Sequence, residues 1–315
     1  MQAPHSVRHV AVLGAGTIGA SWAAWFLSRG LSVAVSDPDP AREAYVRRMI
    51  ANAWPVLARL GRAAAANPEN WTFTTNPADA VRNADFVQEN APERAGIKRE
   101  LYAAIEPALP PETILASSSS GLTMTSLQEG LATPHRFAIG HPFNPPHLIP
   151  LVEVVGGAAT APETIAWCMD FYRHVGKEPI HLKKEALGHL ANRLQAALWR
   201  EAINAVASGL ASVEDVDRAV AYGPGLRWAI MGPALTFHLG GGDGGLAHMF
   251  QQFRPSFEAW WQTMGTPTLT DDLCQKMVEG VLAETKGRSI QDLERERDTL
   301  LVALQETIAH TRGKG

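Results

Sequence analysis

The sequence predicts an α/β protein, with a doubly wound parallel sheet in its N-terminal part and an all-helical C-terminal domain. Short apolar runs alternate with helical stretches through the first half, whereas strand signals are sparse after about Gly188. Strands separated by helices pair in parallel, which gives a sheet covered on both faces. We therefore expect an N-terminal domain over residues 1–184 and a helical domain over residues 185–315.

The apolar runs give the expected strands in order along the chain. They are Val10–Leu13, Leu31–Val35, Phe86–Gln88, Thr113–Ala116, Phe137–Gly140 and Leu151–Val155. Helical periodicity predicts the first helix over Ile18–Ser28, which Arg29-Gly30 ends in the manner of a C-cap. In the C-terminal half the same periodicity covers three stretches, Leu190–Val206, Val213–Ala221 and Leu273–Ala309.

Composition narrows the class of protein. A net charge of −4 gives no electrostatic case for binding nucleic acid or an anionic membrane. There is no apolar run of about 18 residues that would span a membrane, and Met1–His9 is too short and polar for a signal peptide. Cys168 and Cys274 lack metal-ligand spacing, so we expect two free thiols in a cytoplasmic protein without a metal.

A glycine-rich turn follows the first strand. Its six residues are Gly14, Ala15, Gly16, Thr17, Ile18 and Gly19. Such a pattern is weak alone, but here it follows a strand, opens a helix and precedes an acidic residue at the end of the next strand, as a Rossmann-type dinucleotide site requires. The helix N-terminus offers free N–H groups and a positive dipole end to phosphates.

Asp37 ends the second expected strand and indicates which dinucleotide binds. Its carboxylate can accept hydrogen bonds from a ribose 2′-hydroxyl and would repel a 2′-phosphate. No arginine follows it immediately, Arg42 being the nearest. The sequence therefore favours NAD over NADP, with FAD as a minor alternative and a turn without a ligand as the structural alternative.

His141 and Glu153 are the candidates for proton transfer. His141 follows the strand Phe137–Gly140, and the carboxyl ends of parallel strands are where ligands bind. A histidine titrates near neutrality and can take a hydroxyl proton. Glu153 lies inside an apolar run and needs a partner if it is buried. The alternatives are a structural histidine, with His135 and His147 also nearby, and a solvent-facing glutamate.

A run of serines, Ser117–Ser120, ends another strand before Gly121. A serine hydroxyl there can bind the reacting oxygen of a substrate, or the run is only a polar turn that caps the next helix.

These motifs together resemble the 3-hydroxyacyl-CoA dehydrogenase superfamily over nearly 300 residues. The matching features are the glycine turn, the serine run, the segment His141-Pro142-Phe143-Asn144-Pro145, Glu153 and the pair Asn192-Arg193. The resemblance implies His141 as the base, Glu153 as its partner, Ser120 as a ligand of the substrate hydroxyl and Asn192 as a polar contact.

The segment from Gln88 to Glu93, with Lys98, looks like the cofactor-side loop of the superfamily, which makes Glu93 and Lys98 expected cofactor contacts. One departure is Ser118-Ser119, where acyl-CoA enzymes often carry Asn-Thr.

The C-terminal half looks like the branch of the superfamily that acts on small substrates, which includes L-gulonate and L-carnitine 3-dehydrogenases. The stretch Gly225–Pro233 is most similar to the carnitine enzymes. A carnitine-like 3-hydroxy acid carries a quaternary ammonium group, which aromatic faces bind best. Phe143, Trp228 and Phe253 are the expected faces, although each can instead be core or dimer interface, as can Trp199, Trp260 and Trp261.

Three alternatives stay open for the substrate and the class of protein. L-Gulonate would need hydroxyl and amide contacts, and an acyl-CoA such as 3-hydroxybutyryl-CoA would need a basic surface, for which Lys183-Lys184 is the only obvious doublet near the domain junction. A non-catalytic structural protein or an NAD sensor would use the same fold. The resemblance also implies a homodimer formed through the C-terminal helices.

Overall fold

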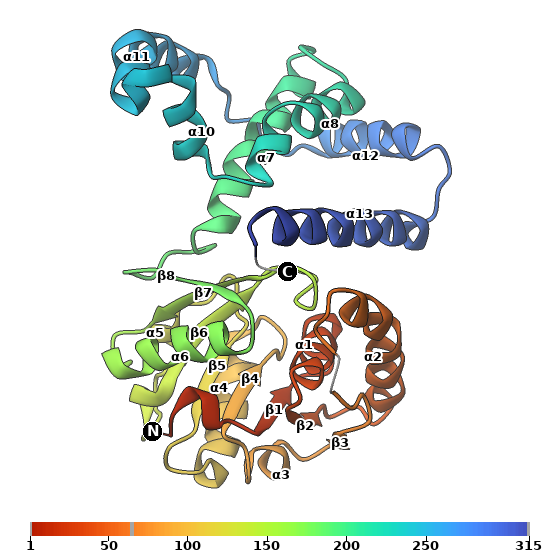
Figure 1. The fold of residues 1–315 in the computed structure, drawn as a ribbon, viewed down its shortest axis with the longest axis vertical. Coiled ribbons are helices and arrows are strands. Elements are labelled where there is room, and N and C mark those ends of the chain that lie inside the picture. The colour runs from red at the N-terminus through yellow and green to blue at the C-terminus, as the bar shows by residue number, and fades with distance from the viewer. Residues whose placement is uncertain (1, 64–65, 314–315) are drawn as a thin grey trace. The chain divides into compact units, whose positions relative to one another are not determined.

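The computed structural model describes residues 2–63 and 66–313, and the chain divides into two compact units, Met1–Ala191 and Asn192–Gly315. Figure 1 shows the ribbon of both. The first unit is an eight-stranded sheet with helices on its faces, and the second is helical, which confirms the predicted fold class.

The sheet of the first unit has the order β3-β2-β1-β4-β5-β6-β7-β8. Its strands are β1 His9–Leu13, β2 Ser32–Ser36, β3 Trp71–Thr74, β4 Phe86–Glu89, β5 Ile114–Ser117, β6 Phe137–Pro142, β7 Leu151–Gly156 and β8 Glu178–His181. The strands β1 to β6 are parallel to one another. The carboxyl ends of β1, β4, β5 and β6 therefore lie at one edge of the sheet, where the predicted site residues follow them.

The sequence interpretation was wrong about the sheet in two respects. It missed β3 and β8, the two short edge strands. It also expected parallel pairing throughout, whereas β7 is antiparallel to β6. The link from Pro142 to Leu151 is too short for the helical crossover that a parallel pair needs, so the chain returns beside β6 in the opposite direction.

Helices cover both faces of this sheet (Figure 1). They are α1 Thr17–Ser28, α2 Arg42–Arg59, α3 Pro77–Val81, α4 Ala95–Ile105, α5 Met124–Leu127 and α6 Pro162–His174, with short 3₁₀ turns at Pro4–Ser6, Glu106–Ala108 and Pro134–Arg136. Alternate residues of β1 enter different cores: Val10 and Val12 pack with α1, α2 and α6, whereas Ala11 and Leu13 pack with α3, α4 and α5. This alternation is what a sheet buried on both faces requires.

The second unit consists of helices alone in the part of it that the structure describes. They are α7 Ala191–Ala207, α8 Val213–Tyr222, α9 Pro224–Trp228, α10 Pro233–Gly240, α11 Gly245–Thr263, α12 Asp271–Thr285 and α13 Ile290–Thr311, with a 3₁₀ turn at Gly242–Gly244. The continuous helical pattern expected from Leu273 to Ala309 is broken, because Lys286 and Gly287 both have a positive φ and separate α12 from α13. Among the described helices, none is long and apolar enough to cross a bilayer.

Candidate active site

The glycine turn between β1 and α1 is built as the sequence predicts. Gly14 has φ +88°, and a Cβ there would lie 2.6 Å from the carbonyl oxygen of Asn90. A Cβ on Gly19 would lie 1.8 Å from the carbonyl oxygen of Gly14, so this position also requires glycine. Gly16 differs, because nothing in the protein lies within 4 Å of its would-be Cβ. The open side of the turn is therefore at Gly16, where a ligand can approach the backbone.

The N-cap residue of α1 is Gly16, which has no side chain to cap the helix. The N–H groups of its first turn are therefore left to a ligand, as in an anion-binding helix terminus. Two other residues of the turn make contacts within the protein. Ala15 is fully buried, and the Thr17 hydroxyl is 3.1 Å from the Tyr45 hydroxyl.

A cleft of about 570 Å³ opens beside this turn at the carboxyl ends of β1, β2 and β4. Gly14, Gly16, Asp37, Asn90 and Ala91 are among the residues that line it. One carboxylate oxygen of Asp37 accepts a 2.8 Å hydrogen bond from the N–H of Ala15, and the other accepts one of 3.0 Å from Asp39. Asp37 is thus fixed at the rim of the cleft, and its charge disfavours a phosphate there.

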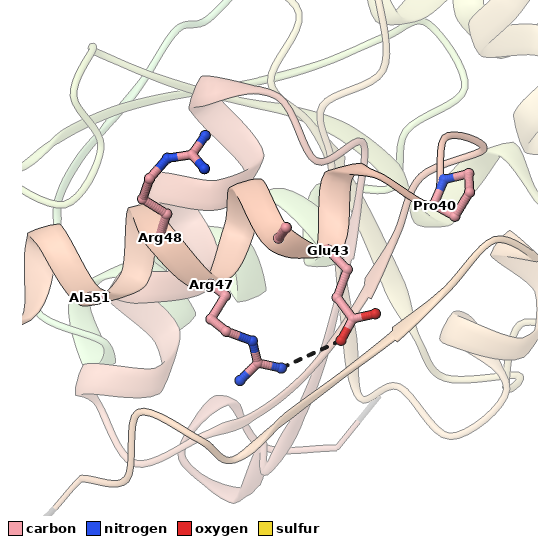
Figure 2. Close-up of a pocket in the computed structure, with 6 residues that line it drawn as sticks. Pro40, Glu43, Arg47, Arg48 and Ala51 are labelled. Atoms are coloured by element: carbon pink, nitrogen blue, oxygen red, sulfur yellow. Dashed lines mark hydrogen bonds and ion pairs between the residues drawn. The ribbon is translucent and has the colours of Figure 1, made fainter.

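Figure 2 shows a second hollow, on α2, lined by Pro40, Glu43, Arg47 and Arg48 among others. Its arginines already have partners: Arg47 forms ion pairs with Glu43 at 3.4 Å and with Glu69 at 2.9 Å, and the Arg48 guanidinium lies over the Tyr45 ring. The cleft at the glycine turn, and not this surface, is therefore the candidate site for a dinucleotide.

The loop after β4 is held by two glutamates. Glu93 accepts hydrogen bonds from the Ser119 hydroxyl at 2.6 Å and from the N–H groups of Ser120 and Gly121 at 3.0 and 2.6 Å. Burial by itself would raise the pKa of Glu93, but these bonds, together with nearby Lys98, lower it below its usual value. Glu93 thereby links the cofactor-side loop to the serine run.

Glu89 was not singled out from the sequence, yet it is fully buried at the end of β4. It accepts bonds from Lys98 Nζ at 2.7 Å, the Tyr102 hydroxyl at 2.6 Å, the Ser117 hydroxyl at 2.6 Å and the Ala91 N–H at 2.5 Å. Lys98 is equally buried, so the structure places it in this ion pair beneath the loop. The sequence around Glu89 shows only a carboxylate at the end of a strand, because the residues that donate hydrogen bonds to Glu89 lie up to 28 positions away along the chain.

His141 and Glu153 lie opposite each other in the register of β6 and β7. The Nδ1–H of His141 donates to Glu153 Oε2 over 2.9 Å, and both side chains are buried. Within the described residues Nε2 of His141 has no hydrogen-bond partner, so it is the nitrogen that can exchange a proton. His135 is exposed, and His147 Nδ1 lies 2.8 Å from the Ser21 hydroxyl.

The second oxygen of Glu153 is also used. Oε1 accepts bonds of 2.9 Å from both Leu190 N–H and Ala191 N–H, at the start of α7. Burial alone would raise the pKa of Glu153, but the bonds from His141, Ala191 and Leu190 outweigh it and hold the pKa below its usual value. Glu153 is therefore kept as a carboxylate, the form that stabilises an imidazolium.

The remaining predicted site residues are placed as follows. Ser120 is half-buried, and in the described part of the chain its hydroxyl has no partner. Phe143 packs edge-on against the His141 ring, with centroids 5.7 Å apart. Asn192, Trp228 and Phe253 belong to the second unit. Trp228 is the last residue of helix α9, and Trp228 and Phe253 are 41% and 40% exposed.

Comparison with known proteins identifies the family. Residues 9–186 match the NAD-binding domain of 3-hydroxyacyl-CoA dehydrogenase, and residues 188–284 match its C-terminal domain. The chain belongs to the 3-hydroxyacyl-CoA dehydrogenase family. As a member of that family it is an NAD-dependent dehydrogenase, and the glycine turn, its uncapped helix and Asp37 are the features of this chain that suit the dinucleotide.

Individual relatives of this dehydrogenase cover nearly the whole chain. It is 50% identical over 298 residues to L-carnitine dehydrogenase of Streptomyces coelicolor, a match that covers 95% of this chain and 94% of the relative. An L-carnitine dehydrogenase of Bacillus cereus is 45% identical over 95% of this chain and 92% of its own length. Among solved structures, an NAD⁺-dependent 5-formyl-3-hydroxy-2-methylpyridine 4-carboxylic acid 5-dehydrogenase superposes with a TM-score of 0.83 at 31% identity, covering 96% and 98% of the two chains.

Proposed function

We propose that this dehydrogenase oxidises the 3-hydroxyl group of L-carnitine to give 3-dehydrocarnitine, with NAD as the hydride acceptor. The observation that carries the chemistry is the buried imidazole of His141, which is bonded to Glu153 through Nδ1 and has no partner at Nε2 among the residues that the structure describes. Support for the substrate comes from the relatives named L-carnitine dehydrogenase, which match this chain at 42–50% identity.

The proposed mechanism assigns one task to each residue. His141 Nε2 takes the proton of the substrate hydroxyl, which leaves its electron pair free to expel hydride from C3. Glu153 fixes the tautomer of His141 and stabilises the imidazolium that forms. The Ser120 hydroxyl and Asn192 hold the reacting oxygen. The turn Gly14–Gly19 would hold NAD through its phosphates, and the bound cofactor would supply the hydride acceptor.

For the quaternary ammonium group of the substrate we propose contacts with the faces of Phe143, Trp228 and Phe253. Cation–π contacts contribute roughly 0.5–2 kcal/mol each. Phe143 supports this role because its ring lies beside that of His141.

We also propose that the chain works as a homodimer in the cytoplasm. Many large apolar side chains of the described second unit are exposed, which favours a covering partner. They include Leu194, Trp199, Leu235, Trp261, Leu282 and Leu300. Both cysteines are free thiols, which is usual in a reducing compartment.

The test compares initial rates of NADH formation with L-carnitine, L-gulonate and 3-hydroxybutyryl-CoA. We expect L-carnitine to give the highest kcat/KM. Activity on the acyl-CoA alone, or on L-gulonate alone, would overturn the substrate and leave the fold unchanged. Binding of NADH without turnover of any of the three would support a non-catalytic NAD-binding protein instead.

A further inference from the structure

A second histidine, His189, lies against His141. The centroids of the two rings are 5.1 Å apart, and the planes are inclined by 48°. His189 is only 3% exposed, in the loop between β8 and α7. Its backbone has φ +49°, a conformation that few residues other than glycine adopt. The protein therefore maintains an unfavourable backbone geometry at the position that brings this ring beside His141.

One nitrogen of His189 is used by the protein and the other is not. Nε2 lies 2.8 Å from the carbonyl oxygen of Ser119, and because a carbonyl only accepts, Nε2 carries a proton. Nδ1 is buried and has no hydrogen-bond partner among the described residues. Buried polar atoms are normally satisfied, so an orphaned nitrogen in a ring that touches His141 indicates a ligand.

The chain around His189 holds this ring in place from both sides. Leu190 N–H and Ala191 N–H donate to Glu153 Oε1, and the ring itself donates to Ser119, whose hydroxyl is bound by Glu93. His189 is thus fixed relative to both the serine run and the His141–Glu153 pair, as a residue that binds a substrate must be.

The charges at the site indicate what that ligand carries. The carboxylate of Glu153 lies beside this site, so a second carboxylate that binds alongside would be repelled unless a cation or an N–H donor accompanies it. His189 can supply both, because an imidazolium formed as the carboxylate binds carries a positive charge and a second N–H, at Nδ1. In a free 3-hydroxy acid a single methylene carbon separates the hydroxyl-bearing carbon from the carboxylate, and two adjacent histidine rings match that close spacing.

We propose that His189 binds the carboxylate of the substrate through Nδ1 while His141 receives the hydroxyl proton. This inference rests on the proposed function and makes His189 the residue that selects free 3-hydroxy acids over derivatives with an uncharged carboxyl group. A thioester or an amide brings no charge to His189 and gains little from it.

The experiment compares L-carnitine with L-carnitinamide, in which an uncharged amide replaces the carboxylate. The variant His189→Asn removes the imidazole and suits a positive φ, because asparagine is enriched in that region. His189→Gln is the second variant, and His181→Asn, an exposed histidine on β8, is the matched control. KM and kcat for both substrates and the Kd of NAD are measured for each protein.

We expect the wild type and the control to prefer the acid. Both His189 variants should raise KM for L-carnitine by about 10- to 100-fold, the usual effect of losing a hydrogen bond to a charged group. Their KM for L-carnitinamide and their Kd for NAD should change by no more than about 2- to 3-fold.

Several results would overturn the assignment. Equal losses on the acid and the amide would indicate a structural role, and weaker NAD binding would indicate that Nδ1 faces the cofactor. A wild-type enzyme without preference for the acid would refute it whatever the variants do. If the wild type oxidises L-carnitine and the variants keep the preference for the acid, only the role of His189 fails; if it oxidises no 3-hydroxy acid, the proposed function fails as well.

Discussion

Glu153 uses its two carboxylate oxygens for two different parts of the first unit. Oε2 accepts from His141 Nδ1 at 2.9 Å, directly across the β6–β7 ladder. Oε1 accepts from the backbone where α7 begins. One buried carboxylate therefore orients the imidazole and fixes the segment that carries His189, so the two histidines share a single anchor.

Glu153 should make stability depend on pH. Its pKa is lowered in the folded state, so its stabilising contribution is complete above the ordinary glutamate value of 4.5 and is lost as the pH falls through the lower folded value. Urea unfolding between about pH 7 and about pH 3 should show a shallower loss of stability in Glu153→Gln than in the wild type. Parallel curves for the two proteins would show that Glu153 contributes no such linkage.

Substitutions at the glycines of the first turn should distinguish an effect on folding from an effect on cofactor binding. Gly16→Ala adds a Cβ in open space, so we expect an unchanged Tm and a Kd for NAD raised by about 10-fold or more. Gly19→Ala drives a Cβ into the Gly14 carbonyl and should lower the Tm as well. Gly232→Ala, also in open space but at the N-cap position before α10, serves as the control. An unchanged Kd for NAD in Gly16→Ala would show that the phosphates of NAD do not bind at this turn.

The buried pair of Glu89 and Lys98 should be strongly coupled. Glu89→Gln leaves the buried ammonium of Lys98 with only the more distant carboxylate of Glu93, 3.9 Å away, and loss of the closer counter-charge costs up to about 3–5 kcal/mol of unfolding free energy. The double variant Glu89→Gln/Lys98→Met removes both charges and should recover part of that loss. A double-mutant cycle by chemical denaturation measures the coupling, and additive single effects would contradict it.

The sequence predicted those parts of the fold whose signals are local. Val10–Leu13, the glycine turn and Asp37 follow one another within a single βαβ unit, so local pattern sufficed to predict the strand, the turn and the helix there. Gly30 has the positive φ expected of a helix-ending glycine. The edge strands β3 and β8 escaped notice because they are short and partly exposed, and β8 contains Pro179.

Only those residues of the candidate site that belong to sequence motifs could be predicted. His141 and Glu153 were paired on the resemblance and on the need of a buried carboxylate for a partner. His189 was missed because its partner Ser119 lies 70 residues away, and nothing in the surrounding sequence reports burial or an unsatisfied nitrogen. Glu89 was missed for the same reason, since its donors are gathered by folding.

The most direct test of the account is the turnover of NAD and L-carnitine by His141→Asn, measured as NADH formation beside the wild type. His135→Asn, at an exposed histidine, is the control. We predict that kcat falls by roughly 100- to 10,000-fold in His141→Asn, as loss of a general base does, while the Kd of NAD stays within about 2-fold of the wild type. A variant that keeps more than about a tenth of the wild-type kcat would contradict the assignment of proton transfer to His141.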